Sequence, residues 1–177
     1  MSGKLDAIIA KILGLEGGFV HDPDDPGGAT KYGITQRTLA KFWGREVSVE
    51  DVESIPEDLA KTIYVSIYFR KPRIDELPES IWPVMLDMSI HHGAGRAVKI
   101  LQTILTARGI CLGPIDGIIG PGTIGAAKKA INVLGAKEIV GDIIDKRVQY
   151  FQRICETNPS LCKFLKGWTR RAESYRI

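Results

Sequence analysis

Hydrophobic residues recur with helical spacing over the first part of the chain. Apolar side chains stand at i, i+3, i+4, i+7 and i+8, namely at Leu5, Ile8, Ile9, Ile12 and Leu13. This spacing is typical of an amphipathic α-helix that buries one face. The helix is expected to run into Glu16 and to end at Gly17–Gly18, because residues without a β-carbon adopt the backbone that ends helices.

The pattern changes over residues 19–34, which hold several glycines and prolines, three aspartates and no helical period. This composition predicts a structured loop or a short hairpin. Thr35 is placed to cap a helix over residues 36–43, and Ser48 with Asp51 resembles a capping box at the start of the next helix.

Most of the remaining chain also has helical periodicity. The predicted helices cover residues 56–69 (first residue Pro56), 83–92 (opened by Pro83, closed by Gly93), 94–108 (ended by Gly109), 123–133 (started by Thr123), 136–156 and 160–175. Strand signals are scarce, and residues 111–122 are rich in turn residues. The sequence therefore predicts a mainly α fold, a helical bundle with at most a small β-hairpin near residues 19–34.

Composition narrows the class of protein. The 177 residues suit one domain or two small lobes. A composition of 44% hydrophobic and 25% charged residues is that of a folded globular protein and argues against a disordered chain. Residues 136–177 carry nine Lys/Arg against five Asp/Glu. This excess suits an anionic polymer such as a cell wall, although a solvated helix face explains it equally well. A net charge of +3 and the lack of a recognition motif argue against nucleic-acid binding.

The N-terminal segment lacks a secretory pattern, since Lys4, Asp6 and Lys11 interrupt its apolar residues. No stretch approaches the roughly 20 apolar residues that span a bilayer, so no stable membrane insertion is expected. Synthesis in the cytoplasm without a signal peptide follows as an expectation. The cysteines fit neither a disulfide framework nor a zinc cluster and are expected to be buried thiols. They are Cys111, Cys155 and Cys162.

The segment that carries chemistry begins at Glu16. A carboxyl group at the end of an apolar helix is expected to have a raised pKa and to keep its proton, as a general acid at a glycosidic oxygen must. The loop that follows presents Asp22, Asp24 and Asp25 as candidates for a second, ionised carboxylate. Thr30 can hold a water through its hydroxyl group. From spacing alone, a solvated glutamate followed by an ordinary turn remains an alternative.

The run EGGFVHDPDDPGGATKYGIT, residues 16–35, resembles the motif of glycoside hydrolase family 108, a group of phage endolysins and bacterial muramidases. The resemblance implies that Glu16 is the catalytic residue. Further along, Asp87 and the His92–Gly93 end of its predicted helix resemble a family stretch that usually reads Asp…Asn-x-Gly, with His91–His92 at that place here.

The second half of the chain resembles the peptidoglycan-binding region that follows in this family. The matching pieces are Leu101-Gln102, Asp116-Gly117-Ile118-Ile119-Gly120-Pro121 with Thr123, and Lys166-Gly167-Trp168 near Arg171. The resemblance implies an α+β lysozyme-like fold, with a catalytic lobe at about 1–93 and a helical peptidoglycan-binding lobe at about 94–177, packed together.

Phage-type lysozymes place Glu, Asp and Thr in this order across a short hairpin, and Glu16, Asp25 and Thr30 are similar in order and spacing. The resemblance implies that Asp25 stabilises the oxocarbenium-like transition state or orients water, and that Thr30 positions that water. Asp22 remains open as the alternative second carboxylate and as a substrate contact. The other expected substrate contacts are Tyr32, Tyr68 and His92.

The implied activity is that of an N-acetylmuramidase acting on peptidoglycan glycan strands, as a monomer and without a cofactor. It would reach the wall in the periplasm after release by a holin or an export system. A metal-dependent wall amidase is one alternative, but the chain has three histidines, His21, His91 and His92, and no HExxH, so no metal site is predicted. A non-catalytic peptidoglycan-binding module is the other alternative.

Overall fold

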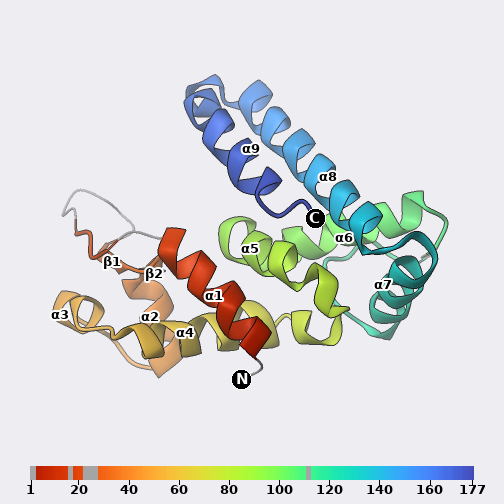
Figure 1. Ribbon diagram of the computed structural model, residues 1–177. Helices are drawn as coiled ribbons and strands as arrows, with labels where there is room; N and C mark the ends of the chain where they lie inside the picture. The colour runs from red at the N-terminus through yellow and green to blue at the C-terminus, as the bar shows by residue number, and fades with distance from the viewer. Residues whose placement is uncertain (1–2, 16–17, 22–27, 111–112) are drawn as a thin grey trace. The chain divides into compact units, whose positions relative to one another are not determined.

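The computed structural model describes residues 3–15, 18–21, 28–110 and 113–177 (Figure 1). Within these residues it consists of helices and one two-stranded antiparallel sheet, which confirms the predicted mainly α fold with a small hairpin. The chain forms two units, Met1–Arg70 and Lys71–Ile177. None of the described helices has the length and apolar character needed to span a membrane.

The first unit is built around an N-terminal helix that packs against α4. Its elements are α1 (Gly3–Leu15), β1 (Thr30–Lys31), β2 (Ile34–Thr35), α2 (Gln36–Trp43), α3 (Val49–Glu53), α4 (Glu57–Tyr64) and the π-helix η1 (Val65–Arg70). All five apolar residues of the predicted stripe on α1 are buried, so the periodicity identified the face that packs.

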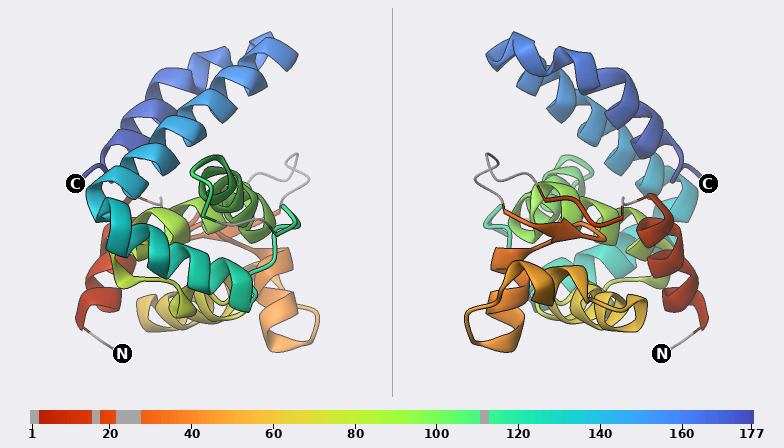
Figure 2. Two further views of the ribbon diagram at one scale, coloured as in Figure 1. Left: turned by 90° about the vertical axis from the view of Figure 1, so that its right-hand side faces the viewer. Right: turned by 90° about the vertical axis from the view of Figure 1, so that its left-hand side faces the viewer.

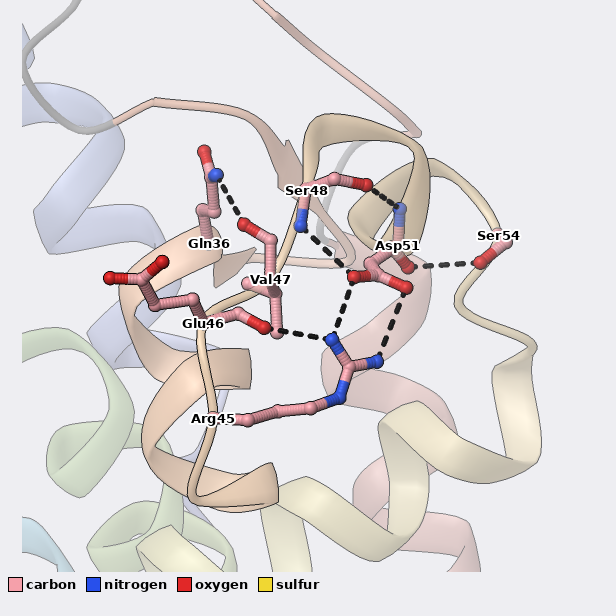
Figure 3. A network of polar contacts seen from close by, with 7 residues as sticks. All are labelled: Gln36, Arg45, Glu46, Val47, Ser48, Asp51 and Ser54. Carbon is pink, nitrogen blue, oxygen red and sulfur yellow. Dashed lines mark hydrogen bonds and ion pairs between the residues drawn. The ribbon is translucent and has the colours of Figure 1, made fainter.

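Local capping signals fix the starts of α2 and α3. The Thr35 side chain accepts a hydrogen bond from the Thr38 backbone N–H at 3.1 Å, as predicted. At α3 the capping box forms: Ser48 accepts from the backbone N–H of Asp51, and Asp51 accepts from that of Ser48. Figure 3 shows Arg45 beside this box, with its guanidinium 3.2 Å from the Asp51 carboxylate. Each cap satisfies backbone donors that a helix start leaves unpaired.

The helix predicted over residues 56–69 differs in detail. Pro56 has extended backbone angles and precedes the first helical residue rather than being that residue. The α-helical part, α4, ends at Tyr64, and the chain continues as the wider π-helix η1. A π-helix is rare and has no signal in apolar spacing, so the sequence could not indicate it.

The second unit is a set of packed helices. Its elements are the short helices η2 (Ile74–Glu76) and η3 (Glu79–Ile81), then α5 (Trp82–His92), α6 (Ala94–Ala107), α7 (Pro121–Leu134), α8 (Ala136–Thr157), the 3-10 helix η4 (Pro159–Phe164) and α9 (Leu165–Glu173). Helix α8 packs against α6, α7, η4 and α9. Figures 1 and 2 show α8 and α9 lying side by side. The core includes Leu101 of α6 and Ile143 of α8, both fully buried.

Three expectations for this unit require correction. Helix α7 begins at Pro121 instead of Thr123, since proline suits the first helical position. The helix predicted over 160–175 is divided into η4 and α9, because Pro159 starts a separate 3-10 segment. Cys162 is exposed rather than buried.

The other two cysteines have different outcomes. Cys155 is buried as expected, and a hydrogen bond with Cys162, together with burial, raises its pKa to about 11. Cys111 lies outside the described residues.

A polar network centred on the uncharged amide of Gln102 joins α6 to the turn before α7. The buried Gln102 side chain donates to Asp116 Oδ1 at 2.9 Å and to Thr123 Oγ1 at 3.2 Å, and it accepts from the Gly117 backbone N–H at 2.8 Å. Gly117 has φ +82°, and a β-carbon there would lie 2.7 Å from the carbonyl oxygen of Gly95. These family-like residues therefore hold a turn in place.

Candidate functional site

The predicted hairpin forms within the first unit. Strands β1 and β2 pair in antiparallel register with Thr30 opposite Thr35, and Val20 exchanges two 2.8 Å backbone hydrogen bonds with Thr30. Tyr32 (φ 52°) and Gly33 (φ 71°) form the turn. Positive φ at both central residues is the requirement of a type I′ turn, the geometry that suits the twist of a two-residue hairpin.

Thr30, the predicted water-positioning residue, is half-buried on β1. Its hydroxyl lies 3.5 Å from the carbonyl oxygen of Gly28, which is a weak hydrogen bond. The backbone beside it is anchored to α2, because the Gln36 N–H donates to Ala29 O at 2.9 Å. The Gln36 side chain in turn donates to Val47 O at 2.7 Å (Figure 3). The loop end that carries Thr30 is thus held by the body of the unit.

Tyr64 supports the turn of the hairpin and also contacts Tyr68. Tyr64, only 1% exposed, donates its hydroxyl to the backbone oxygen of Tyr32 at 2.5 Å. The ring of half-buried Tyr68 lies 5.5 Å from that of Tyr64. On the other side, Lys31 donates to Glu53 O at 2.6 Å, which joins β1 to the end of α3. Two of the predicted contacts, Tyr32 and Tyr68, are therefore connected through Tyr64.

The contact of Tyr64 with the hairpin turn is one that the sequence analysis did not assign. Its spacing of four from Tyr68 on a predicted helix was the available signal, since such residues lie on one face. The predicted catalytic residues Glu16 and Asp25 and the predicted contact Asp22 lie outside the described residues, so their roles stay predictions.

A charged cluster lies inside the second unit, around the fully buried Asp87 of α5. Arg147 of α8 places Nη2 2.6 Å from Asp87 Oδ2, and Arg171 of α9 places Nη2 2.8 Å from Oδ1. The Tyr175 hydroxyl donates to Oδ1 at 3.0 Å. His91 Nε2 lies 3.6 Å from the same oxygen. One carboxylate therefore joins three helices and the C-terminal segment.

Electrostatics in this cluster favour the ionised carboxylate. Burial alone would raise the pKa of Asp87, but the positive charges of Arg147 and Arg171 outweigh it and hold the pKa below its ordinary value. The same carboxylate raises the pKa of Tyr175, after burial, so that its phenol stays protonated. Two arginines thus face one aspartate, which leaves an excess positive charge in this part of the unit.

His92, the predicted substrate contact at the end of α5, belongs to this second unit. Its Nε2 accepts a hydrogen bond from Arg147 Nε at 3.0 Å. Burial, followed by the charges of Arg147 and His91, lowers the pKa of His92 to about 4. The imidazole is therefore neutral near pH 7, with its other nitrogen protonated.

His92 also lines a cavity of about 520 Å³. The residues around this cavity are His91, His92, Arg147, Tyr150, Phe151, Ile154, Leu161, Trp168 and Arg171. They come from α5, α8, η4 and α9. Trp168 is half-buried at this cavity. Among the described residues, no group of three His, Cys, Asp or Glu side chains is arranged to hold a metal ion.

Comparison with known proteins supplies the family context. The glycosyl hydrolase 108 family model matches residues 9–93, and the model described as a predicted peptidoglycan domain matches residues 96–173. The chain is similar to the structure of Brucella abortus SagA, with 34% identity and a TM-score of 0.79, over 99% of this chain and 93% of that one. No curated protein sequence matches. The two family matches meet near residue 95, whereas the two structural units meet after Arg70.

Proposed function

Because the chain belongs to the glycosyl hydrolase 108 family, we propose that it is an N-acetylmuramidase that uses Glu16 as its general acid. The family and the peptidoglycan domain identify a glycoside hydrolase that acts on peptidoglycan. The proposal adds the bond, the β-1,4 linkage between N-acetylmuramic acid and N-acetylglucosamine. The observation that carries it is the family match over residues 9–93, which contains Glu16 and the whole hairpin.

In the proposed reaction Glu16 protonates the leaving glycosidic oxygen. Asp25 stabilises positive charge on the sugar ring or orients the attacking water, with Asp22 as the alternative. Thr30 is a suitable partner for that water, because its half-buried hydroxyl makes only a weak hydrogen bond to Gly28 O. Tyr32 and Tyr68 are proposed to contact the glycan strand.

We place the biological action at the cell wall. Release of the protein by a holin, or by an export system, would bring a chain made in the cytoplasm to the periplasm. Fractionation of producing cells before and after lysis tests this, since a wall-active enzyme must appear with the periplasmic fraction before it degrades peptidoglycan.

The test of the activity is mass spectrometry of peptidoglycan digested by the wild type and by Glu16→Gln. New reducing-end N-acetylmuramic acid is expected from the wild type, whereas new amino groups would indicate an amidase. Glu16→Gln removes the proton donor and is expected to lower the rate roughly 10²–10⁴-fold. Glu156→Gln is the matched control, because Glu156 is an exposed residue of α8 in the second unit. Near-normal digestion by folded Glu16→Gln protein would refute the catalytic assignment.

A further inference from the structure

The cavity in the second unit has walls suited to a partly apolar ligand. The Trp168 ring lies 5.4 Å from Phe151 and 5.8 Å from Phe164, so it is fixed between two aromatic neighbours. His92 lies edge-on to Tyr150 at 5.6 Å on the other wall. Rings that are held in place offer contact area with little loss of conformational freedom, as is usual in ligand sites.

Among the described residues, those that line the same cavity include two arginines and no acidic side chain. Arg147 is 1% exposed, and its Nη1 makes no hydrogen bond within the described residues. Arg171, with 21% of its side chain exposed, reaches the cavity from α9. Asp87 compensates one of these two charges, and His92 is neutral. A buried positive charge without a full counter-charge raises the free energy of the folded protein, and an anionic ligand can remove that penalty.

From these walls and this charge we propose that the cavity binds a carboxylate of peptidoglycan next to an apolar or sugar-ring face. Arginine is the side chain best suited to carboxylates, because its planar group presents several parallel donors. Two parts of peptidoglycan offer this chemistry: the lactyl carboxylate of a muramic acid without its peptide, and the carboxylates of the stem peptide. The inference rests on the proposed function for the identity of the polymer.

The choice of ligands separates this site from catalysis. The disaccharide GlcNAc-β-1,4-MurNAc contains no MurNAc–GlcNAc bond, so a muramidase leaves it intact and binding can be measured on the wild-type chain. Four probes are titrated by calorimetry: the disaccharide with its peptide, the same compound with its carboxylates amidated, the disaccharide without peptide, and chitobiose. Binding of the first but not of its amidated form assigns the stem peptide as the source. Equal binding of the peptide-free disaccharide assigns the lactyl carboxylate.

A matched pair of variants tests whether this cavity is the place of binding. Leu161 lines it from η4 and takes no part in the Asp87 cluster. Leu161→Asp places a negative charge beside the negatively charged ligand, whereas Leu161→Asn makes nearly the same change of shape without a charge. The aspartate variant is expected to weaken binding at least about tenfold relative to the asparagine variant, because like charges at a binding site oppose association strongly. Thermal melts of both proteins establish that they fold.

Three outcomes would overturn the inference. They are equal affinity for chitobiose and the carboxylate ligands, equal affinity of the two Leu161 variants, and no measurable binding of any probe. A wild type that binds these ligands through the cavity but releases no reducing-end sugar from peptidoglycan would refute the muramidase proposal and leave the binding site standing. If the wild type is a muramidase but Leu161→Asp and Leu161→Asn bind the ligands equally, the binding site in the cavity is refuted and the muramidase proposal stands.

Discussion

Two polar networks in the second unit have a buried residue at their centre, Gln102 in one and Asp87 in the other. They differ in the charge of that residue and in how fully their polar groups are hydrogen-bonded. The Gln102 network is centred on an uncharged amide, whose nitrogen donates to the Asp116 carboxylate and to Thr123 and whose oxygen accepts from the Gly117 N–H. The Asp87 cluster is charged and joins α5, α8 and α9. In the part of the chain that the structure describes, Arg147 Nη1 makes no hydrogen bond, and Arg147 lines a cavity. The fully hydrogen-bonded Gln102 network is suited to stabilising the fold. The excess positive charge of the Asp87 cluster, next to an open cavity, is suited to binding an anion.

The first test of the difference between the two networks is to remove the negative charge of Asp87 from its cluster. Asp87→Asn keeps the shape but leaves two arginines, one of them fully buried, without their counter-charge. Breaking a buried pair typically costs about 3–5 kcal/mol, and a loss of this size is expected in the free energy of unfolding. Chemical denaturation provides the measurement.

The control for Asp87→Asn is Asp142→Asn. Asp142 pairs with Arg108 on the surface, 2.8 Å away. A surface pair contributes about 0–1 kcal/mol, so this variant is expected to be near wild type. Similar losses in the two variants would mean that burial of Asp87 has no special energetic consequence.

The second way is to disturb the turn that the Gln102 network holds. Gly117→Ala forces an alanine into φ +82° and brings its β-carbon against Gly95 O. Backbone strain of this kind costs about 1–3 kcal/mol, and the turn must shift as well. Gly122→Ala is the matched control, because a β-carbon at Gly122 meets nothing within 4 Å. Gly117→Ala should bind carboxylate ligands in the cavity as the wild type does, which would show that the Gln102 network is not needed for that binding. Equal melting temperatures of Gly117→Ala and Gly122→Ala would contradict the strain argument.

These networks also show how far the sequence could lead. The caps at Thr35 and Ser48 and the residues of the Gln102 turn were visible because each involves neighbours in the chain or a family-like motif. The Asp87 cluster was not visible, because its partner Tyr175 lies 88 residues away and nothing in local spacing connects them. His92 was selected by resemblance, but its bond to Arg147 required the fold.

In the first unit the sequence indicated a hairpin and could not give the details that support it. Positive φ at Tyr32 was hidden, since tyrosine rarely adopts it, and only the following glycine suggested the turn. The hydroxyl of Tyr64 reaches Tyr32 across 32 residues. Which aspartate accompanies Glu16 concerns residues outside the described part of the chain, so that choice stays a prediction.

A third prediction uses pH to report on the cluster alone. Folding lowers the pKa of His92 from 6.5 to about 4, so the folded state favours the neutral imidazole. The stability that this provides is complete above pH 6.5 and is lost as the pH falls from about 6.5 toward 4. The charged groups around it are Arg147, His91, Asp87 and Arg96. Arginine side chains are not deprotonated in proteins at these pH values, and the pKa of Asp87 is held below its ordinary value.

His92→Gln is the variant for this test, because glutamine can accept the hydrogen bond from Arg147 and does not titrate. Unfolding free energies measured from pH 7 to pH 4 should fall less steeply in His92→Gln than in the wild type. Both proteins keep His91, so the difference between the two curves reports the change at position 92. Parallel curves would show that His92 is not held neutral by the fold.

The smallest effect on stability is expected outside both networks, on the basic surface formed by Lys163, Lys166 and Arg170. All three side chains are exposed, so reversing them to glutamate should leave the melting temperature nearly unchanged.

The charge of this basic surface can still attract an anionic wall. Salt distinguishes this attraction from binding in the cavity, because exposed charges are screened within about 10 Å at 0.1 M salt while buried charges are screened much less. Binding of the triple variant to intact walls should therefore be weaker than wild type at low salt and should converge with it as salt is added. Binding of the carboxylate fragments should stay the same at every salt concentration, since those ligands are too small to need the outer surface once they occupy the cavity. If wall binding is unaffected even at the lowest salt, the surface is only solvated and the wall is held by the cavity; if fragment binding falls as well, the two regions are not independent.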